Sequence, residues 1–278
     1  MQIVTEKLTF SYPRQAIPAL SPLDWQVEEG ALVAMIGASG SGKSTLARLL
    51  MGFIEPSGGC IKIHRQGKKK GELFPRVGLV MQNPQQQLFG ETVLEEVAFA
   101  PKNLGFSAAE TDAIVRSSLE EVGLDPSDFL PRSPFTLSGG EKRRVAIAGI
   151  LAACPRILIL DEPTAGLDEP GRRWIMELVR RKNKNEGLTV IWITHQMEEA
   201  AELAQNVLVL QKGGPPFYGP VREVFAEEER LAALGLDVPL SAKLVRRLKA
   251  AGKSLPALAL TAEEAAAEIL AWCGGGGG

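Results

Sequence analysis

The sequence predicts an α/β fold built on a mostly parallel sheet, and three short apolar runs carry this prediction. Each run has turn residues beside it and is followed by a segment with helical spacing; the runs are residues 31–36, 157–160 and 189–193. A continuous apolar run is typical of a strand that is buried on both faces of a parallel sheet. Because parallel strands need a crossover between them, alternation with helices indicates an α/β core.

The other elements follow in chain order. Residues 3–10 and 23–27 predict a small antiparallel β part, and helical spacing at 92–100, 108–122 and 141–153 predicts an inserted helical subdomain. Beyond the turn at Gly213 and Gly214 we expect helical pieces to the end, including 241–250 and 262–272. We therefore expect a main domain over 1–225 with a helical subdomain at about 84–153, a C-terminal helical region over 226–273 and a glycine-rich tail over 274–278.

Composition excludes some classes of function. The 278 residues carry 31 Lys and Arg against 33 Asp and Glu, a net charge of −2 that argues against a nucleic-acid partner. No run reaches the roughly 20 apolar residues that cross a bilayer, and the first ten residues lack the layout of a signal peptide. Three cysteines without a CxxC pair favour a reducing compartment. The lysine run 68–70 predicts a solvated loop.

A glycine-rich loop follows the first buried strand. Residues 37–45 match the pattern G-x-x-x-x-G-K-[ST], and they lie between a strand and a helix as the pattern requires. Glycines let backbone N–H groups surround phosphate oxygens, and the start of the following helix favours an anion. We expect Lys43 to reach the β- and γ-phosphates and Ser44 to bind Mg²⁺. The candidate nucleotide ligands are Gly37, Ser39, Gly40, Ser41, Gly42, Lys43, Ser44 and Thr45.

Two acidic residues end the second buried strand. Asp161 can reach a Mg²⁺ ion held by the glycine-rich loop, and Glu162 can polarise an attacking water molecule. Since Pro163 follows, the pair could also be a solvated turn. The upstream phosphate-binding loop favours the functional interpretation.

A second helix start is suited to bind an anion. Residues 137–141 read Leu-Ser-Gly-Gly-Glu and place Ser138, Gly139 and Gly140 at a helix N-terminus. By itself this is an ordinary N-cap. One nucleotide does not need two phosphate-binding helix ends from one chain, however. We therefore expect a dimer in which this end faces the γ-phosphate held by the other subunit.

Taken together, these motifs resemble the ATP-binding cassette (ABC) ATPases. The matching elements occur in the family's order and cover roughly residues 1–225; they are 37–45 (Walker A), Gln82 (Q-loop), 137–141 (signature), 157–162 (Walker B), 165–168 (D-loop) and His195 (switch). The resemblance implies ATP as the substrate, Mg²⁺ as the cofactor, and the P-loop NTPase form of the α/β fold.

The resemblance also implies a role for each matching residue. Glu162 matches the general base, His195 the residue that contacts the γ-phosphate, and Gln82 the residue that senses Mg²⁺ and couples to the membrane partner. The implied metal ligands are Ser44, Gln82 and Asp161. Tyr12 matches the aromatic residue that stacks on adenine, and Asp168 the D-loop acid at the dimer interface. Glu141 departs from the family, where many members have Gln.

Two further segments resemble a subgroup of the family. The run from Gln82 to Gly105 is similar to the ATPase subunits of energy-coupling factor (ECF) importers, including the cobalt and nickel group. Residues 235–239 and the basic amphipathic helix after them resemble the C-terminal region through which these ATPases contact each other. Alternatively, the C-terminal helices cap the core.

The implied machine has a second cassette subunit, alike or different, a transmembrane scaffold subunit and a small substrate-binding membrane subunit. It takes up a vitamin or a transition-metal ion, and the chain works at the cytoplasmic face of the membrane. The alternatives are the ATPase of another ABC transporter and a non-transport cassette of DNA repair, chromosome structure or translation. The short interval between Walker A and the signature, without heptads, and the single cassette argue against the non-transport classes. The glycine tail could be a linker to a second cassette or a truncation point.

Overall fold

A computed structural model describes residues 2–14, 17–64, 77–253, 255 and 258–275 of the chain. Within them, a six-stranded sheet has the order β5-β6-β7-β3-β8-β9, in which β9 is antiparallel to β8 and the other neighbours are parallel. The prediction of a mostly parallel sheet is confirmed. Its strands are β3 (Leu32–Ile36), β5 (Val77–Val80), β6 (Ile157–Asp161), β7 (Thr189–Ile193), β8 (Asn206–Val209) and β9 (Phe217–Pro220).

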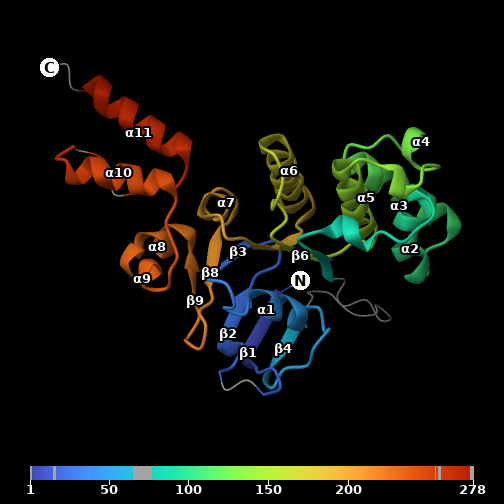
Figure 1. Ribbon diagram of the computed structural model, residues 1–278, viewed down its shortest axis with the longest axis horizontal. Helices are drawn as coiled ribbons and strands as arrows, with labels where there is room; N and C mark the ends of the chain where they lie inside the picture. The colour runs from blue at the N-terminus through green and yellow to red at the C-terminus, as the bar shows by residue number, and fades with distance from the viewer. Residues whose placement is uncertain (1, 15–16, 65–76, 254, 256–257, 276–278) are drawn as a thin grey trace.

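A smaller antiparallel sheet lies below this one in Figure 1, beside helix α1. It has the order β2-β1-β4, and the predicted N-terminal antiparallel part is therefore present. Its strands are β1 (Gln2–Phe10), β2 (Leu20–Val27) and β4 (Gly58–His64), and α1 spans Lys43–Leu50.

The central strands are buried on both faces, which explains their continuous apolar sequence. Along β3, Ala34 packs into one hydrophobic cluster with the helices on one face of the large sheet. Val33 and Met35 pack into a second cluster on the opposite face, with the small sheet and α1. Trp192 of β7 is fully buried in the first cluster, and Ile193 in the second. This alternation fixes the register of the sheet, because a slip of one residue would exchange the two faces.

Helices cover the face of the large sheet that lies away from the small sheet, and a helical group extends to one side (Figure 1). Between β5 and β6, this group comprises the 3-10 turns Pro84–Gln87 and Pro134–Thr136 and the helices α2 (Val93–Asn103), α3 (Ala108–Glu121), α4 (Pro126–Phe129) and α5 (Gly139–Ala152). The helices predicted there are present, although α2 continues through Pro101 to Asn103, three residues beyond its expected end at Ala100. Helices α6 (Glu169–Glu186) and α7 (Met197–Leu203) lie against the large sheet.

The C-terminal part carries a small core of its own. Helices α10 (Leu240–Ala250) and α11 (Ala262–Gly275) enclose Val245, Leu255, Ala259 and Ala265. The short helices α8 (Val221–Ala226) and α9 (Glu228–Ala233) connect them to β9. The boundaries of the C-terminal region and of the helical subdomain stay predictions.

Four strands were not expected from the sequence. Strand β9 contradicts the prediction of helices alone beyond Gly214, and β4, β5 and β8 have no counterpart among the expected elements. Strands β5 and β8 have only four residues each, and β9 contains glycine and proline, which favour turns. The lysine run 68–70 and tail residues 276–278 lie outside the described part of the chain. Within the described part, no helix has both the length and the apolar character that crossing a membrane requires.

Candidate active site

The sequence-predicted residues meet at one edge of the large sheet. Strands β5, β6, β7 and β3 are parallel neighbours, so their carboxyl ends lie at the same edge. The chain leaves these ends through Gln82, the pair Asp161 and Glu162, the switch residue His195, and the glycine-rich loop. In open α/β sheets, ligands bind outside the carboxyl ends of such strands.

The glycine-rich loop is held tightly against the protein. Gly42 precedes α1 with φ of 102°, and a Cβ atom there would lie 2.2 Å from the carbonyl oxygen of Ala19. Only glycine suits both this conformation and this contact. The next residue, Lys43, is 6% exposed, and its Nζ donates to the carbonyl oxygens of Gly37 at 2.7 Å and Ala38 at 3.1 Å. The ammonium group is thereby fixed over the loop.

Charge and burial act in opposite directions on Lys43. Burial lowers the pKa of its ammonium group, while the nearby carboxylates of Glu162 and Asp161 raise it, and burial has the larger effect. A phosphate group at the loop would add negative charge beside this cation. The pKa of Lys43 would then rise again.

Two side chains with oxygen atoms that can bind a metal ion meet where α1 begins and β6 ends. The hydroxyl of Ser44 donates to Asp161 Oδ2 at 3.0 Å, which brings together two of the three predicted metal ligands. Hydroxyl and carboxylate oxygens are the donors that Mg²⁺ prefers. No group of three or more His, Cys, Asp or Glu side chains in the described residues is arranged to hold a metal ion. The site therefore fits an ion that takes few protein ligands and completes its shell with phosphate oxygens and water, as Mg²⁺ does.

The three candidate catalytic residues are in contact. Glu162 Oε1 lies 3.0 Å from Nε2 of His195, and Glu162 Oε2 accepts a hydrogen bond from Nε2 of Gln82 at 3.1 Å. Glu162 has a φ of 49°, and its backbone N–H donates to the carbonyl oxygen of Ile193 at 3.0 Å. A non-glycine residue in this left-handed region costs about 1–3 kcal/mol, and such residues cluster at active sites.

Tyr12 lies beside the first turn of α1. Its hydroxyl is 3.3 Å from Thr45 Oγ1 and accepts from Arg48 Nη1 at 3.4 Å. Its ring packs edge-to-face on Phe10, with ring centroids 4.8 Å apart. The predicted adenine-stacking residue is therefore next to the predicted phosphate site.

Two predicted elements do not join this group. Ser138 N-caps α5, where its hydroxyl accepts from the backbone N–H of Glu141 and the Glu141 carboxylate accepts from the N–H of Ser138. Gly139 and Gly140 are exposed, and α5 lies apart from α1 in Figure 1. Asp168 is also exposed and N-caps α6 through the backbone N–H of Gly171 at 3.0 Å.

Arg143 is a site residue that sequence reasoning missed. It is 5% exposed, and its guanidinium donates to the carbonyl oxygens of Pro163 at 2.7 Å, Gln82 at 3.1 Å and Ala165 at 3.3 Å. It thus ties the signature helix to the segments after β5 and β6. A polar residue in the expected helix 141–153 could have been noted, but nothing in the sequence distinguished it from exposed Lys or Arg.

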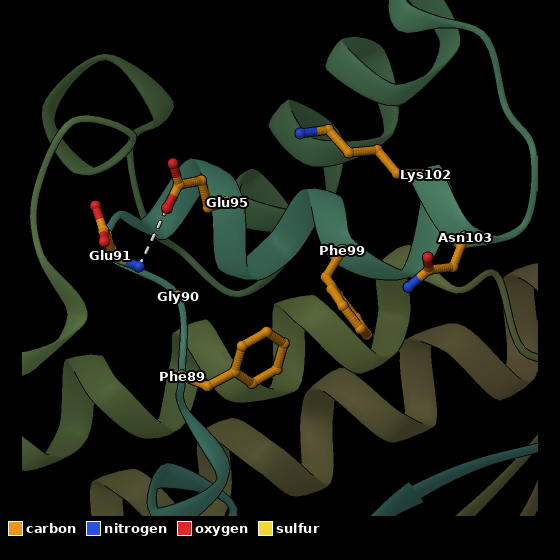
Figure 2. A pocket seen from close by; sticks show the side chains of 7 residues that line it. All are labelled: Phe89, Gly90, Glu91, Glu95, Phe99, Lys102 and Asn103. Atoms are coloured by element: carbon orange, nitrogen blue, oxygen red, sulfur yellow. Dashed lines mark hydrogen bonds between the residues drawn. The ribbon is translucent and has the colours of Figure 1, made fainter.

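A hollow of about 500 Å³ lies beside the segment after Gln82 (Figure 2). Figure 2 shows Phe89 and Phe99 side by side in it, and they pack edge-to-face with centroids 4.8 Å apart although each is more than half exposed. The buried carboxylate of Glu96 accepts from the backbone N–H groups of Phe89 at 2.8 Å and Gly90 at 2.7 Å. Glu96 therefore holds the start of this wall, and Glu95 accepts from the backbone N–H of Glu91 at 3.1 Å (Figure 2).

Comparison with known proteins identifies the family to which the chain is similar. The family model described as "ABC transporter" matches residues 20–165, more than half of the chain. The energy-coupling factor transporter ATP-binding protein EcfA2 of Bacillus cereus (strain ATCC 10987 / NRS 248) is 41% identical, covering 97% of this chain and 96% of the relative. EcfA2 of Ligilactobacillus salivarius is 43% identical, with 99% of each chain covered.

Two solved structures show the same fold. One is cbiO1 from Clostridium perfringens, part of the ABC transporter complex cbiONQ, with a TM-score of 0.71, 34% identity and coverage of 90% of this chain and 96% of that one. The other is the ATP-binding cassette MJ0796 as a dimer in a post-hydrolysis state with ADP and Pi, with a TM-score of 0.67, 28% identity and coverage of 79% and 99%. The chain therefore belongs to the ABC transporter family of ATPases, and within it to the ATP-binding proteins of energy-coupling factor transporters.

Proposed function

We propose that this chain hydrolyses ATP at the edge formed by β5, β6, β7 and β3, and thereby powers import through an energy-coupling factor transporter. The contact of Glu162 with both His195 and Gln82 carries the proposal. It places a carboxylate between two polar side chains at the sheet edge that also carries Lys43.

Binding would use the loop and its neighbours. Lys43 and the backbone N–H groups of residues 37–45 hold the β- and γ-phosphates, while Tyr12 stacks on adenine. Ser44 and Asp161, with Gln82, hold Mg²⁺. Bound there, the ion neutralises charge on the phosphate oxygens.

Hydrolysis would depend on position and on one proton acceptor. Glu162 Oε1 or Oε2 accepts the proton of the attacking water, and His195 holds Glu162 and contacts the γ-phosphate. Gln82 holds the other oxygen of the carboxylate, so the base is supported from two sides. Fixed donors that face the developing charge supply the rest of the rate increase.

A second cassette would complete the site. The exposed Ser138, Gly139 and Gly140 face outward at the start of α5, and Asp168 is exposed at the start of α6. In a dimer they contact the ATP and the loop of the partner, either a second copy of this chain or a different cassette. The C-terminal region 226–273 adds to this dimer contact. The dimeric form of the solved cassette with ADP and Pi supports this arrangement.

The remaining partners would be membrane proteins. A transmembrane scaffold subunit docks at the hollow beside Phe89 and Phe99, and a small substrate-binding membrane subunit selects a vitamin or a transition-metal ion. This arrangement places the chain at the cytoplasmic face of the membrane. The similarity to cbiO1, which is part of a transporter complex, supports it.

The substitution Glu162→Gln tests the chemistry. We expect ATP turnover to fall about a hundredfold or more, because a general base contributes at least that much. ATP-bound dimers should accumulate, measured by size-exclusion chromatography with ATP and Mg²⁺. Glu186→Gln, at the C-terminal end of α6, is the control and should turn over ATP normally. Turnover of Glu162→Gln like that of the unaltered chain would refute the assignment of the base.

Co-purification tests the transport role. Expression of the chain with its genomic neighbours, followed by detergent extraction, should recover a scaffold membrane protein with it. Tight recovery with DNA or ribosomes instead would refute the role in import and leave the ATPase assignment standing.

A further inference from the structure

Glu199 is a buried carboxylate that the proposed chemistry does not use. It lies in the first turn of α7 and is fully buried. Its Oε2 accepts hydrogen bonds from Nε1 of Trp192 at 3.1 Å and from the hydroxyl of Thr194 at 2.8 Å. A buried charge is costly unless it is paired and hydrogen-bonded, so these contacts account for its presence inside the protein.

The hydroxyl of Thr194 uses both of its hydrogen-bonding functions. It donates its one proton to Glu199, and it accepts from the backbone N–H of Gln196 at 2.9 Å. The carboxylate therefore sets the direction of the hydroxyl proton and leaves a lone pair for Gln196. His195 lies between Thr194 and Gln196 in the chain, so this hydrogen bond holds the backbone on both sides of it. Its Nε2 is 3.0 Å from Glu162 Oε1.

The other oxygen of Glu199 faces α6. Its Oε1 lies 3.5 Å from Nε of Arg172, which is one turn into that helix. Both atoms are buried and neither makes a hydrogen bond, so the contact is an ion pair without an aligned bond. The backbone N–H of Arg172 donates to the carbonyl oxygen of Asp168, the N-cap of α6. Glu199 therefore joins the exposed end of α6 to the turn that carries His195.

We propose that Glu199 is a positioning residue for His195, and that through Arg172 it couples this position to the end of α6 that carries Asp168. The inference rests on the proposed role of His195 at the γ-phosphate. When the second subunit contacts Asp168, the first turn of α6 moves with it, and the Arg172–Glu199 ion pair passes the shift to the His195 turn. Docking of the two cassettes then sets the position of the γ-phosphate contact.

Steady-state kinetics of the full chain test this role. Thr194→Val removes the hydroxyl at nearly constant shape, and we expect kcat to fall about tenfold or more with KM for ATP unchanged, because small displacements of a reacting group are costly. Thr194→Ser keeps the hydroxyl and should restore kcat. Glu199→Gln and Arg172→Gln should lower kcat in the same direction. Since Arg172 is partly exposed, its variant tests the coupling even where Glu199→Gln is poorly folded.

The His195→Ala background separates positioning from general destabilisation. If Glu199 acts through His195, Thr194→Val and Glu199→Gln should cause no further loss of kcat there, as expected for residues that act as a unit. An equal loss in both backgrounds would overturn the inference. A rise in KM with unchanged kcat would do the same.

Histidine resonances give a readout that does not need turnover. The chain has two histidines, and in ¹⁵N-histidine spectra the His195 signal is the one lost in His195→Ala. Glu199→Gln should displace that signal and leave the His64 signal in place. The control is Glu198→Gln, whose exposed side chain accepts from the backbone N–H of Leu240 at 3.2 Å; it should change neither signal nor kcat.

Two outcomes are decisive in different ways. An unmoved His195 signal in both Glu199→Gln and Thr194→Val would overturn the positioning role and leave the proposed function standing. Unaltered turnover in His195→Ala would refute the proposed role of His195 itself, and the inference with it.

Discussion

At the edge of the large sheet, Glu162 contacts His195 and Gln82, whereas at the start of α5 the hydroxyl of Ser138 turns back onto Glu141 of its own helix. The first group is assembled within one chain. The second group caps its own helix and presents Gly139 and Gly140 to the outside. Under the proposed function, the sheet edge is the hydrolytic half of the site, and the start of α5 is the half that faces the nucleotide of another subunit.

The two regions also differ in what holds them. At the sheet edge, the central strands β3, β6 and β7 are buried on both faces, so the loops that follow them start from rigid points. The helical subdomain is tied to this edge by Arg143, whose guanidinium reaches Pro163, Ala165 and Gln82. A buried Arg that bonds three carbonyl groups links the positions of the two halves. The same tie orients α5 relative to the sheet.

The largest effect should come from separating the two halves on different chains. Lys43→Ala damages the sheet edge and Gly139→Asp damages the α5 end, and each should abolish turnover in a pure sample. Mixed in equal amounts, they should recover about a quarter of the normal rate, since half of randomly formed dimers hold one intact site of two. This recovery is measured as the rate of phosphate release from the mixture at increasing protein concentration.

The matched control mixes two variants of the same half. Lys43→Ala with Glu162→Gln should recover nothing, because neither chain then supplies an intact sheet edge. Recovery in this control, or none in the first mixture although its dimers form, would contradict the division into halves on different chains.

A smaller effect is expected where the hollow is altered instead of the active site. Glu96→Ala leaves the backbone N–H groups of Phe89 and Gly90 without their carboxylate. Loss of such bonds costs about 1–3 kcal/mol, so affinity for the membrane scaffold should fall about tenfold or more, measured by binding in detergent. ATP turnover of the chain alone should stay within about twofold. Glu120→Ala on the exposed face of α3 is the control, and an equal loss of affinity there would contradict a specific role for Glu96.

The pH dependence should distinguish free and ATP-bound forms of the sheet edge. Burial lowers the pKa of Lys43 below the ordinary lysine value, and only the protonated form attracts phosphate. Since kcat/KM reports the free enzyme, it should fall as pH rises through this lowered pKa. The fall in kcat should come at higher pH, because bound phosphate stabilises the ammonium group.

Lys43→Arg provides the comparison for this alkaline fall. Arg stays protonated, so the residual activity of this variant should lack the fall in kcat/KM. An alkaline fall shared by Lys43→Arg and the unaltered chain would assign it to another group.

The sequence correctly predicts those parts of the molecule that depend on a local sequence pattern. The sequence predicts that the loop around Gly42, the acids Asp161 and Glu162 and the switch residue His195 lie at strand ends, and the structure has them there. Local pattern suffices in these cases because a glycine-rich loop and a buried strand each leave a continuous signal in the chain.

The parts that were missed depend on contacts between distant segments. Arg143, Glu96 and Glu199 are charged residues in helices, and sequence alone does not distinguish a buried charge with partners from an exposed one. Strand β9 was missed because it pairs at the edge of the sheet with a sequence that contains Gly219 and Pro220. For both kinds of feature, the partner is chosen by the tertiary fold, which overrides local preference.

The smallest effect is expected at Glu141, the departure from the family pattern in the signature. Its carboxylate accepts from the backbone N–H of Ser138 at 2.8 Å. This bond, the interaction with the Ser138 hydroxyl and the nearby positive charge of Arg132 together lower the pKa of Glu141. Gln can fill the same capping position, so Glu141→Gln should keep turnover within about twofold. A carboxylate with a lowered folded pKa stabilises the protein above its unfolded pKa and loses that effect as pH falls through the folded value. The unaltered chain should therefore have the higher thermal midpoint at pH 7, by a small margin that shrinks in acid. A margin that grows in acid, or a large loss of turnover, would show that the charge of Glu141 acts beyond its own helix.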